Sequence, residues 1–100
     1  MEKARAKLRV ARDLVERGEW DDRVSRAYYA AFHAAQAAVL CEGERADTHQ
    51  GVLTLFGLLL VKTGKIDRKW GRALAEADGF VNAVGEYVAR QIDQADNGTV

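Results

Sequence analysis

The feature that most restricts how this chain can fold is the alanine-rich stretch 24–42, VSRAYYAAFHAAQAAVLCE. It contains no glycine and no proline, and alanine has the highest helix propensity of all residues. The stretch therefore predicts one helix of about five turns. At about 100° per residue, apolar or small residues fall on two opposite sides of this helix. We expect such a helix to be enclosed by other helices over most of its circumference.

The two sides of this predicted helix differ in their polar content. One side carries Val24, Tyr28, Ala31, Ala35 and Val39. The other side carries Arg26, Tyr29 and His33, with Ala30 and Ala37 beside them. We expect Tyr28 and Phe32 in the core. The alanines allow close helix packing, which we expect across a dimer interface.

Three further helical patterns flank the central stretch. Residues 2–17 place apolar side chains at three- and four-residue spacing, facing a core. They are Ala4, Leu8, Ala11, Leu14 and Val15. Gly18 ends this helix, and Asp21 or Asp22 can cap the next one. Because the connection between the two helices is short, we expect them to be antiparallel neighbours.

The second half of the chain predicts two more helices. Thr48 is a favourable N-cap for a mostly buried helix over 52–61, with His49 in its first turn and Gly64 at its end. A long pattern then runs from Ile66 to Ile92, with a bend or break expected near Gly79. The polar tail, about 93–100, is expected to fray. The sequence therefore predicts an all-α, up-and-down four-helix bundle forming a single domain over 1–100.

Composition narrows the possible functions. The 100 residues are 30% charged and 48% hydrophobic, which argues against both a disordered and a membrane-embedded chain. No apolar run approaches the roughly 18–20 residues that cross a bilayer, and the first residues do not resemble a signal peptide. The single cysteine, Cys41, excludes an internal disulfide framework, so we expect a cytoplasmic protein. Two histidines and one cysteine without ligand spacing predict no metal site, and no cofactor is expected.

The formal net charge is zero, so contact with nucleic acid would have to come from a local patch. The first helix offers a candidate patch on its polar face. Its basic residues are Lys3, Arg5, Lys7, Arg9, Arg12 and Arg17. This face is either an ordinary solvated helix surface or a patch that faces phosphate groups.

Several sequence motifs together resemble those of the HEPN domains, in the branch of small stand-alone prokaryotic proteins. The motifs are, in chain order, SRAYYAAFHAAQA, THQGV, LVKTGKID and WGRAL. The resemblance covers about residues 1–90. The resemblance implies a four-helix bundle that forms a two-fold homodimer. Many HEPN domains are metal-independent endoribonucleases, including toxins, whose motif is an Arg followed by a His on one helix. Here Arg26 and His33 match that motif, with six residues between them.

The chemistry of RNA cleavage suits these residue types. An imidazole can accept or donate a proton near neutral pH, and a guanidinium can stabilise the extra negative charge of the transition state. We therefore predict Arg26 and His33 as catalytic residues. Tyr29 is a supporting residue that can bond phosphate or stack on a base. Asp22 either orients Arg26 or simply caps the helix.

Two other functions remain open at this stage. Relatives that cleave RNA usually carry a polar residue directly after the motif Arg, whereas this chain has Ala27. The second hypothesis is a non-catalytic HEPN module that binds a minimal nucleotidyltransferase, which acts as antitoxin or partner in other pairs of this family. The third is a purely structural dimer without a ligand.

Overall fold

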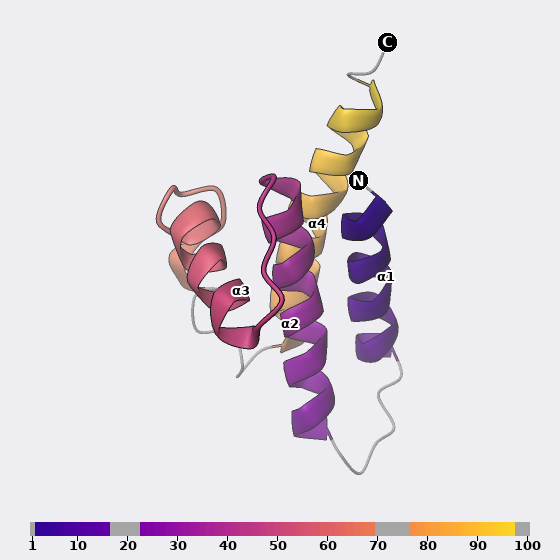
Figure 1. Cartoon of the computed structure of the whole chain (residues 1–100). Helices are drawn as coiled ribbons and strands as arrows, with labels where there is room; N and C mark the ends of the chain where they lie inside the picture. The colour runs from indigo at the N-terminus through magenta and orange to yellow at the C-terminus, as the bar shows by residue number, and fades with distance from the viewer. Residues whose placement is uncertain (1, 17–22, 70–76, 98–100) are drawn as a thin grey trace.

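The computed structural model describes residues 2–16, 23–69 and 77–97. They form α1 (Glu2–Glu16), α2 (Arg23–Cys41), α3 (His49–Phe56), a π-helical segment η1 (Gly57–Val61) and α4 (Ala77–Asn97). These described ranges contain no strand, and α1 and α2 run antiparallel (Figure 1). The predicted all-α four-helix bundle is therefore confirmed, whereas the predicted up-and-down order is not, because α3 and α4 run in the same direction as α2 (Figure 1). Gly18, Asp21 and Asp22 lie outside the described residues.

Helix α2 is the centre of the molecule, and it contacts α1, α3, η1 and α4. The alanine-rich stretch is buried on most of its circumference, as its pattern predicted. The fully or nearly fully buried residues of α2 are Ala30, Ala31, Ala34, Ala35, Ala37, Ala38 and Val39. The alanines pack against the other helices of the same chain. The expectation that they pack across a dimer interface is therefore wrong, because single-chain packing already covers them.

Helices α1 and α4 close the bundle on one side of α2. Ala4, Leu8 and Ala11 of α1 are buried in the core, as predicted. Helix α4 begins at Ala77 and continues through Gly79 and Gly85 without a break. Its last turns are helical rather than frayed, and an ion pair of 3.0 Å joins Asp96 Oδ2 to Arg5 Nη2 of α1.

Helix α3 begins where the sequence predicted. The Thr48 side chain accepts a hydrogen bond of 3.0 Å from the backbone N–H of Gly51, which satisfies one of the free donors of the first turn. Val52, Phe56 and Leu60 are buried, but Leu53 is 52% exposed and Leu58 is 50% exposed. The segment 49–61 is therefore amphipathic rather than mostly buried.

The connection 42–48 determines where α3 lies. Just after α2 the chain turns at Gly43, whose φ is +80°, and the N–H groups of Gly43 and Glu44 bond to Leu40 O and Val39 O. The chain then runs back alongside α2, so α3 begins beside the middle of α2 and runs in the same direction (Figure 1). As a result, residues 44–47 lie next to the last turns of α2 rather than beyond them.

A polar cluster ties the end of α2 to two other parts of the chain. Glu42 accepts hydrogen bonds from Lys65 Nζ and from Tyr87 Oη of α4, the latter at 2.7 Å. Burial opposes ionisation of Glu42, but these two hydrogen bonds and the Lys65 charge outweigh it and hold the pKa of Glu42 below its ordinary value of 4.5. Burial, followed by the Glu42 carboxylate, raises the pKa of Tyr87 well above its ordinary value. The cluster therefore favours an ionised Glu42 and a neutral Tyr87.

Candidate active site

One line of residues along α2 carries most of the polar groups of this helix. We call it the α2 stripe, and it consists of Arg26, Tyr29, His33 and Gln36, which follow one another at spacings of three and four residues. At 1.5 Å per residue, Arg26 and His33 are about 10 Å apart along the axis and on the same face. The backbone of Arg26 is described and helical, whereas its side chain is outside the described part. Asp22 is outside it altogether.

His33 is held in one orientation by its own helix. Its Nδ1 lies 2.8 Å from the backbone oxygen of Tyr29, one turn earlier. A carbonyl oxygen can only accept, so Nδ1 carries the proton and Nε2 keeps its lone pair in the neutral imidazole. The ring also meets Phe32 edge-on, with ring centroids 5.8 Å apart. Among the described residues Nε2 has no hydrogen-bond partner, so it is free to exchange a proton with a ligand.

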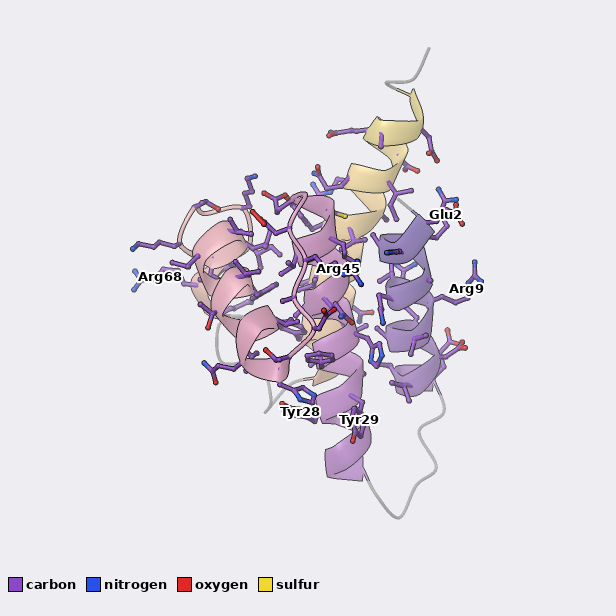
Figure 2. All side chains as sticks on the ribbon, in the orientation of Figure 1. Glu2, Arg9, Tyr28, Tyr29, Arg45 and Arg68 are labelled. Atoms are coloured by element: carbon purple, nitrogen blue, oxygen red, sulfur yellow. The ribbon has the colours of Figure 1, made fainter. Side chains whose placement is uncertain are left out.

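Tyr29 is the most accessible aromatic residue near His33. Its side chain is 50% exposed, and its ring lies edge-on to that of Tyr28 with centroids 6.1 Å apart. Figure 2 shows Tyr29 on the face of α2 that is turned toward the viewer, whereas Tyr28 lies toward α3. Tyr29 can therefore contact a ligand at His33 without moving the core.

The second histidine, His49, has a different environment. Its ring lies 4.2 Å from that of Phe32 and 5.4 Å from that of Tyr28, measured between centroids. These tilted ring contacts give His49 a structural role in the first turn of α3. Tyr28 and Phe32 were expected in the core but are only partly buried. Phe32 packs against the core cluster, and the His49 ring lies beside both aromatic rings.

The structure also reveals a groove that the sequence did not predict. We call it the α1–α2 groove. It has a volume of about 300 Å³ and is lined by Lys3, Lys7, Gln36, Leu40, Arg45, Ala46 and Asp47. Gln36 belongs to both the stripe and the groove. The spacing of Gln36 from His33 could have placed it on the stripe, but nothing in the sequence shows that 44–47 returns to cover it.

Other chemistries find little support in the described residues. Burial, together with the neighbouring Glu42 charge, raises the pKa of Cys41 to about 11, so its thiol is protonated and unreactive at neutral pH. Within 2–16, 23–69 and 77–97, no three His, Cys, Asp or Glu residues lie close enough together to hold a metal ion. No helix in these ranges is long and apolar enough to cross a membrane.

These observations define a small α-helical domain whose enclosed central helix carries an Arg and a His about two turns apart on one face, with Nε2 of the His free among the described residues. The family model for the HEPN domain matches residues 1–90, and the chain belongs to the HEPN domain family.

Similar proteins come from archaea and bacteria. The chain is 42% identical to a UPF0332 protein of Pyrococcus horikoshii over 64% of this chain and 45% of that protein. It is 38% identical to the Methanocaldococcus jannaschii protein named "Putative toxin MJ0605" over 77% of this chain and 58% of that protein. It is 33% identical to a UPF0332 protein of Gloeobacter violaceus over 87% of this chain and 68% of that protein.

The matched region thus spans about half the length of the first two relatives. No solved structure matches the chain significantly.

Proposed function

We propose that this protein is a toxin-like, metal-independent endoribonuclease that cleaves RNA at a site formed across a homodimer. The observation that carries the proposal is the geometry of His33. Its Nδ1–H is fixed by the Tyr29 carbonyl, Nε2 is free, and the motif Arg26 lies on the same face of the same helix. Membership of the HEPN family and the toxin names of two relatives support the proposal.

The proposed reaction is an internal transfer of the phosphate. The ribose 2′-oxygen attacks the adjacent phosphorus, the bond from phosphorus to the 5′-oxygen breaks, and a 2′,3′-cyclic phosphate and a 5′-hydroxyl form. Nε2 of a neutral His33 accepts the 2′-hydroxyl proton. Arg26 stabilises the charge on the equatorial oxygens of the transition state, for which its planar donors are suited.

The cleavage reaction needs a general acid as well as a general base, and a homodimer can supply both. One imidazole cannot accept the 2′-hydroxyl proton and donate to the 5′-oxygen in the same step. A two-fold dimer supplies a second copy of His33, which in its protonated form can donate that proton. Tyr29, which is half exposed beside His33, is available to contact the RNA strand.

A second candidate function is a non-catalytic module that binds a minimal nucleotidyltransferase. Ala27 directly after Arg26 favours it, because a polar residue is usual there in the relatives that cleave RNA. This module would retain the fold and the dimer but would not cleave RNA.

The test is RNA cleavage by the purified protein in EDTA, beside the Arg26→Ala variant. We expect products that end in 2′,3′-cyclic phosphate, and a rate about 10²–10³-fold lower for Arg26→Ala, in line with the loss of a donor to the transition state. Circular dichroism and sedimentation would establish that the variant is folded and associated like the parent. If the unmutated protein cleaves no RNA from varied pools but co-purifies with a nucleotidyltransferase, the second function is the right one.

A further inference from the structure

The α1–α2 groove lies at the end of the α2 stripe, where three separate parts of the chain meet. Helix α1 contributes Lys3 and Lys7, which are one turn apart, and the connection after α2 contributes Arg45. The floor contains Gln36 and Leu40 of α2. Three cations and one carboxylate, Asp47, therefore surround one depression in a chain whose net charge is zero.

The cations of this groove are available to a ligand. Lys3 and Lys7 form no hydrogen bond or ion pair with the described residues. The Arg45 guanidinium lies 3.6 Å from Asp47 at the surface, where such pairs contribute little. Arg5 of the same helix is different, because it is already paired with both Glu2 and Asp96. On the basic face of α1, Arg5 is thus engaged in ion pairs, whereas Lys3 and Lys7 line the groove and can face phosphate groups.

Gln36 provides an independent indication of a ligand. Its Nε2 donates to the Ala46 backbone oxygen at 3.4 Å, while its Oε1 is buried and has no partner. Exchanging the two amide atoms would not help, because an oxygen would then face the Ala46 carbonyl. A buried acceptor without a donor is costly. Because Oε1 is closed to solvent, the O–H or N–H group of a ligand reaches it when the long 3.4 Å bond from Nε2 to the Ala46 oxygen opens.

The groove is continuous with the candidate active site. Gln36 is one turn beyond His33 on the α2 stripe, about 4.5 Å further along the axis. Figure 2 shows Tyr29 and Arg45 on the same side of α2, with Arg45 toward its C-terminal end. A strand with its reacting phosphate at His33 would therefore meet the groove with the neighbouring nucleotide.

We propose that the α1–α2 groove is a subsite for single-stranded RNA, which holds the nucleotide next to the cleaved phosphate. Lys3, Lys7 and Arg45 contact its phosphate group. Gln36 Oε1 accepts a hydrogen bond from the ribose 2′-hydroxyl or from a base amino group. This subsite deepens the proposed ribonuclease function and rests on it for the identity of the strand.

The test measures binding separately from cleavage. A fluorescently labelled single-stranded RNA would be titrated with the His33→Ala protein at several salt concentrations. The double variant Lys3→Gln/Lys7→Gln and the single variant Arg45→Gln would be made in this His33→Ala protein and titrated in the same way. The matched controls are Arg9→Gln and Arg68→Gln, because Figure 2 shows Arg9 pointing away from α2 and Arg68 beyond α3.

The salt dependence gives a quantitative expectation. Each phosphate contact of a single strand contributes about 0.7 to the slope of log K against log salt. Because Lys3, Lys7 and Arg45 share one phosphate, the double lysine variant and Arg45→Gln should each lower the slope by up to about 0.7, and the controls by less than half of that. Equal effects of the groove variants and the control variants on RNA binding would overturn the subsite. It would also be overturned if a nucleoside monophosphate bound with the same dependence on the groove residues while the oligonucleotide did not bind.

Gln36→Leu tests the second half of the proposal. The variant keeps the size of the side chain and removes the unpaired oxygen, so the thermal midpoint should not fall. We expect weaker RNA binding, by about fivefold or more. If Gln36→Leu weakens the binding of RNA but not of DNA with the same sequence, the donor is the ribose 2′-hydroxyl. If it weakens the binding of both strands equally, the donor is a base amino group. Unchanged affinity for both strands would overturn the role of Gln36.

The outcomes for the subsite and for the ribonuclease are distinguishable. Groove-dependent RNA binding by a parent protein that does not cleave would contradict the catalytic function and leave the subsite intact. Cleavage that is indifferent to Lys3, Lys7 and Arg45, with unchanged binding, would contradict the subsite alone.

Discussion

At the scale of single residues, hydrogen bonds distinguish side chains that look alike in the sequence. His33 and His49 both lie in helices, yet the first is oriented by a backbone carbonyl and the second packs at a tilt against Phe32 and Tyr28. The spacing of Arg26 and His33 on one face was predictable, because helical periodicity fixes it. The tautomer of His33 and the unpaired oxygen of Gln36 were not, since they depend on coordinates that no sequence pattern encodes.

The Glu42 cluster makes a prediction about pH at this scale. The folded pKa of Glu42 lies below its ordinary value of 4.5, so its stabilisation is complete above that pH and is lost as the pH falls further. The folded pKa values of Tyr87 and Cys41 lie above their ordinary 10.0 and 9.0, so their stabilisation is complete below about pH 9 and is lost as the pH rises. Urea unfolding across pH should therefore show a plateau of stability between about pH 5 and 9.

The variant Tyr87→Phe isolates one part of this behaviour. It removes a hydrogen bond to a carboxylate, which should cost about 1.5 kcal/mol at pH 7 because the pair is partly exposed. The loss of stability above pH 10 should also become shallower. Tyr29→Phe is the control, since Tyr29 is half exposed and should leave both quantities unchanged. An unchanged unfolding free energy for Tyr87→Phe would contradict the assigned cluster.

At the scale of elements, the apolar patterns predicted where the helices lie in the sequence better than they predicted which side chains the packing leaves exposed. The bounds of α1 and α2 differ from the predicted ranges by about one residue, because caps and periodicity are local signals. The exposure of Leu53 and Leu58 was not predictable, since it depends on the route of 42–48 beside α2. The continuity of α4 through Gly79 shows that packing overrides the low helix propensity of glycine.

Two helical glycines give a matched prediction about packing. A Cβ at Gly57 would meet nothing within 4 Å, whereas a Cβ at Gly85 would lie 3.2 Å from Leu8 Cδ1 and 3.3 Å from Arg12 Nη2. Gly57→Ala should therefore stabilise the fold by about 0.5–1 kcal/mol through helix propensity alone. Gly85→Ala should gain less or lose stability, because the ends of the Leu8 and Arg12 side chains must give way by a few tenths of an ångström. Thermal and urea unfolding of both variants would check this, and a larger gain at Gly85 would contradict the close approach of α1 and α4.

At the scale of the whole molecule, the proposed cleavage requires two copies of the chain. The alanines of α2 are buried within one chain, so the dimer must form through other surfaces. The surface that carries the half-exposed Tyr29 is a suitable dimer interface. We predict a dimer in sedimentation equilibrium at micromolar concentration. A monomer under those conditions would contradict the two-copy site while leaving the fold untouched.

The most direct test of the central claim compares the two histidines in one RNA cleavage assay in EDTA. His33→Ala removes the free Nε2 and should lower the cleavage rate by about 10²–10⁴-fold, the usual contribution of a general acid or base. His49→Ala removes an imidazole that packs against the same Phe32 ring and should leave the rate within a few-fold, provided that both variants stay folded. Cleavage that survives in His33→Ala, or that is lost equally in both variants, would contradict the assignment of His33 as the catalytic residue.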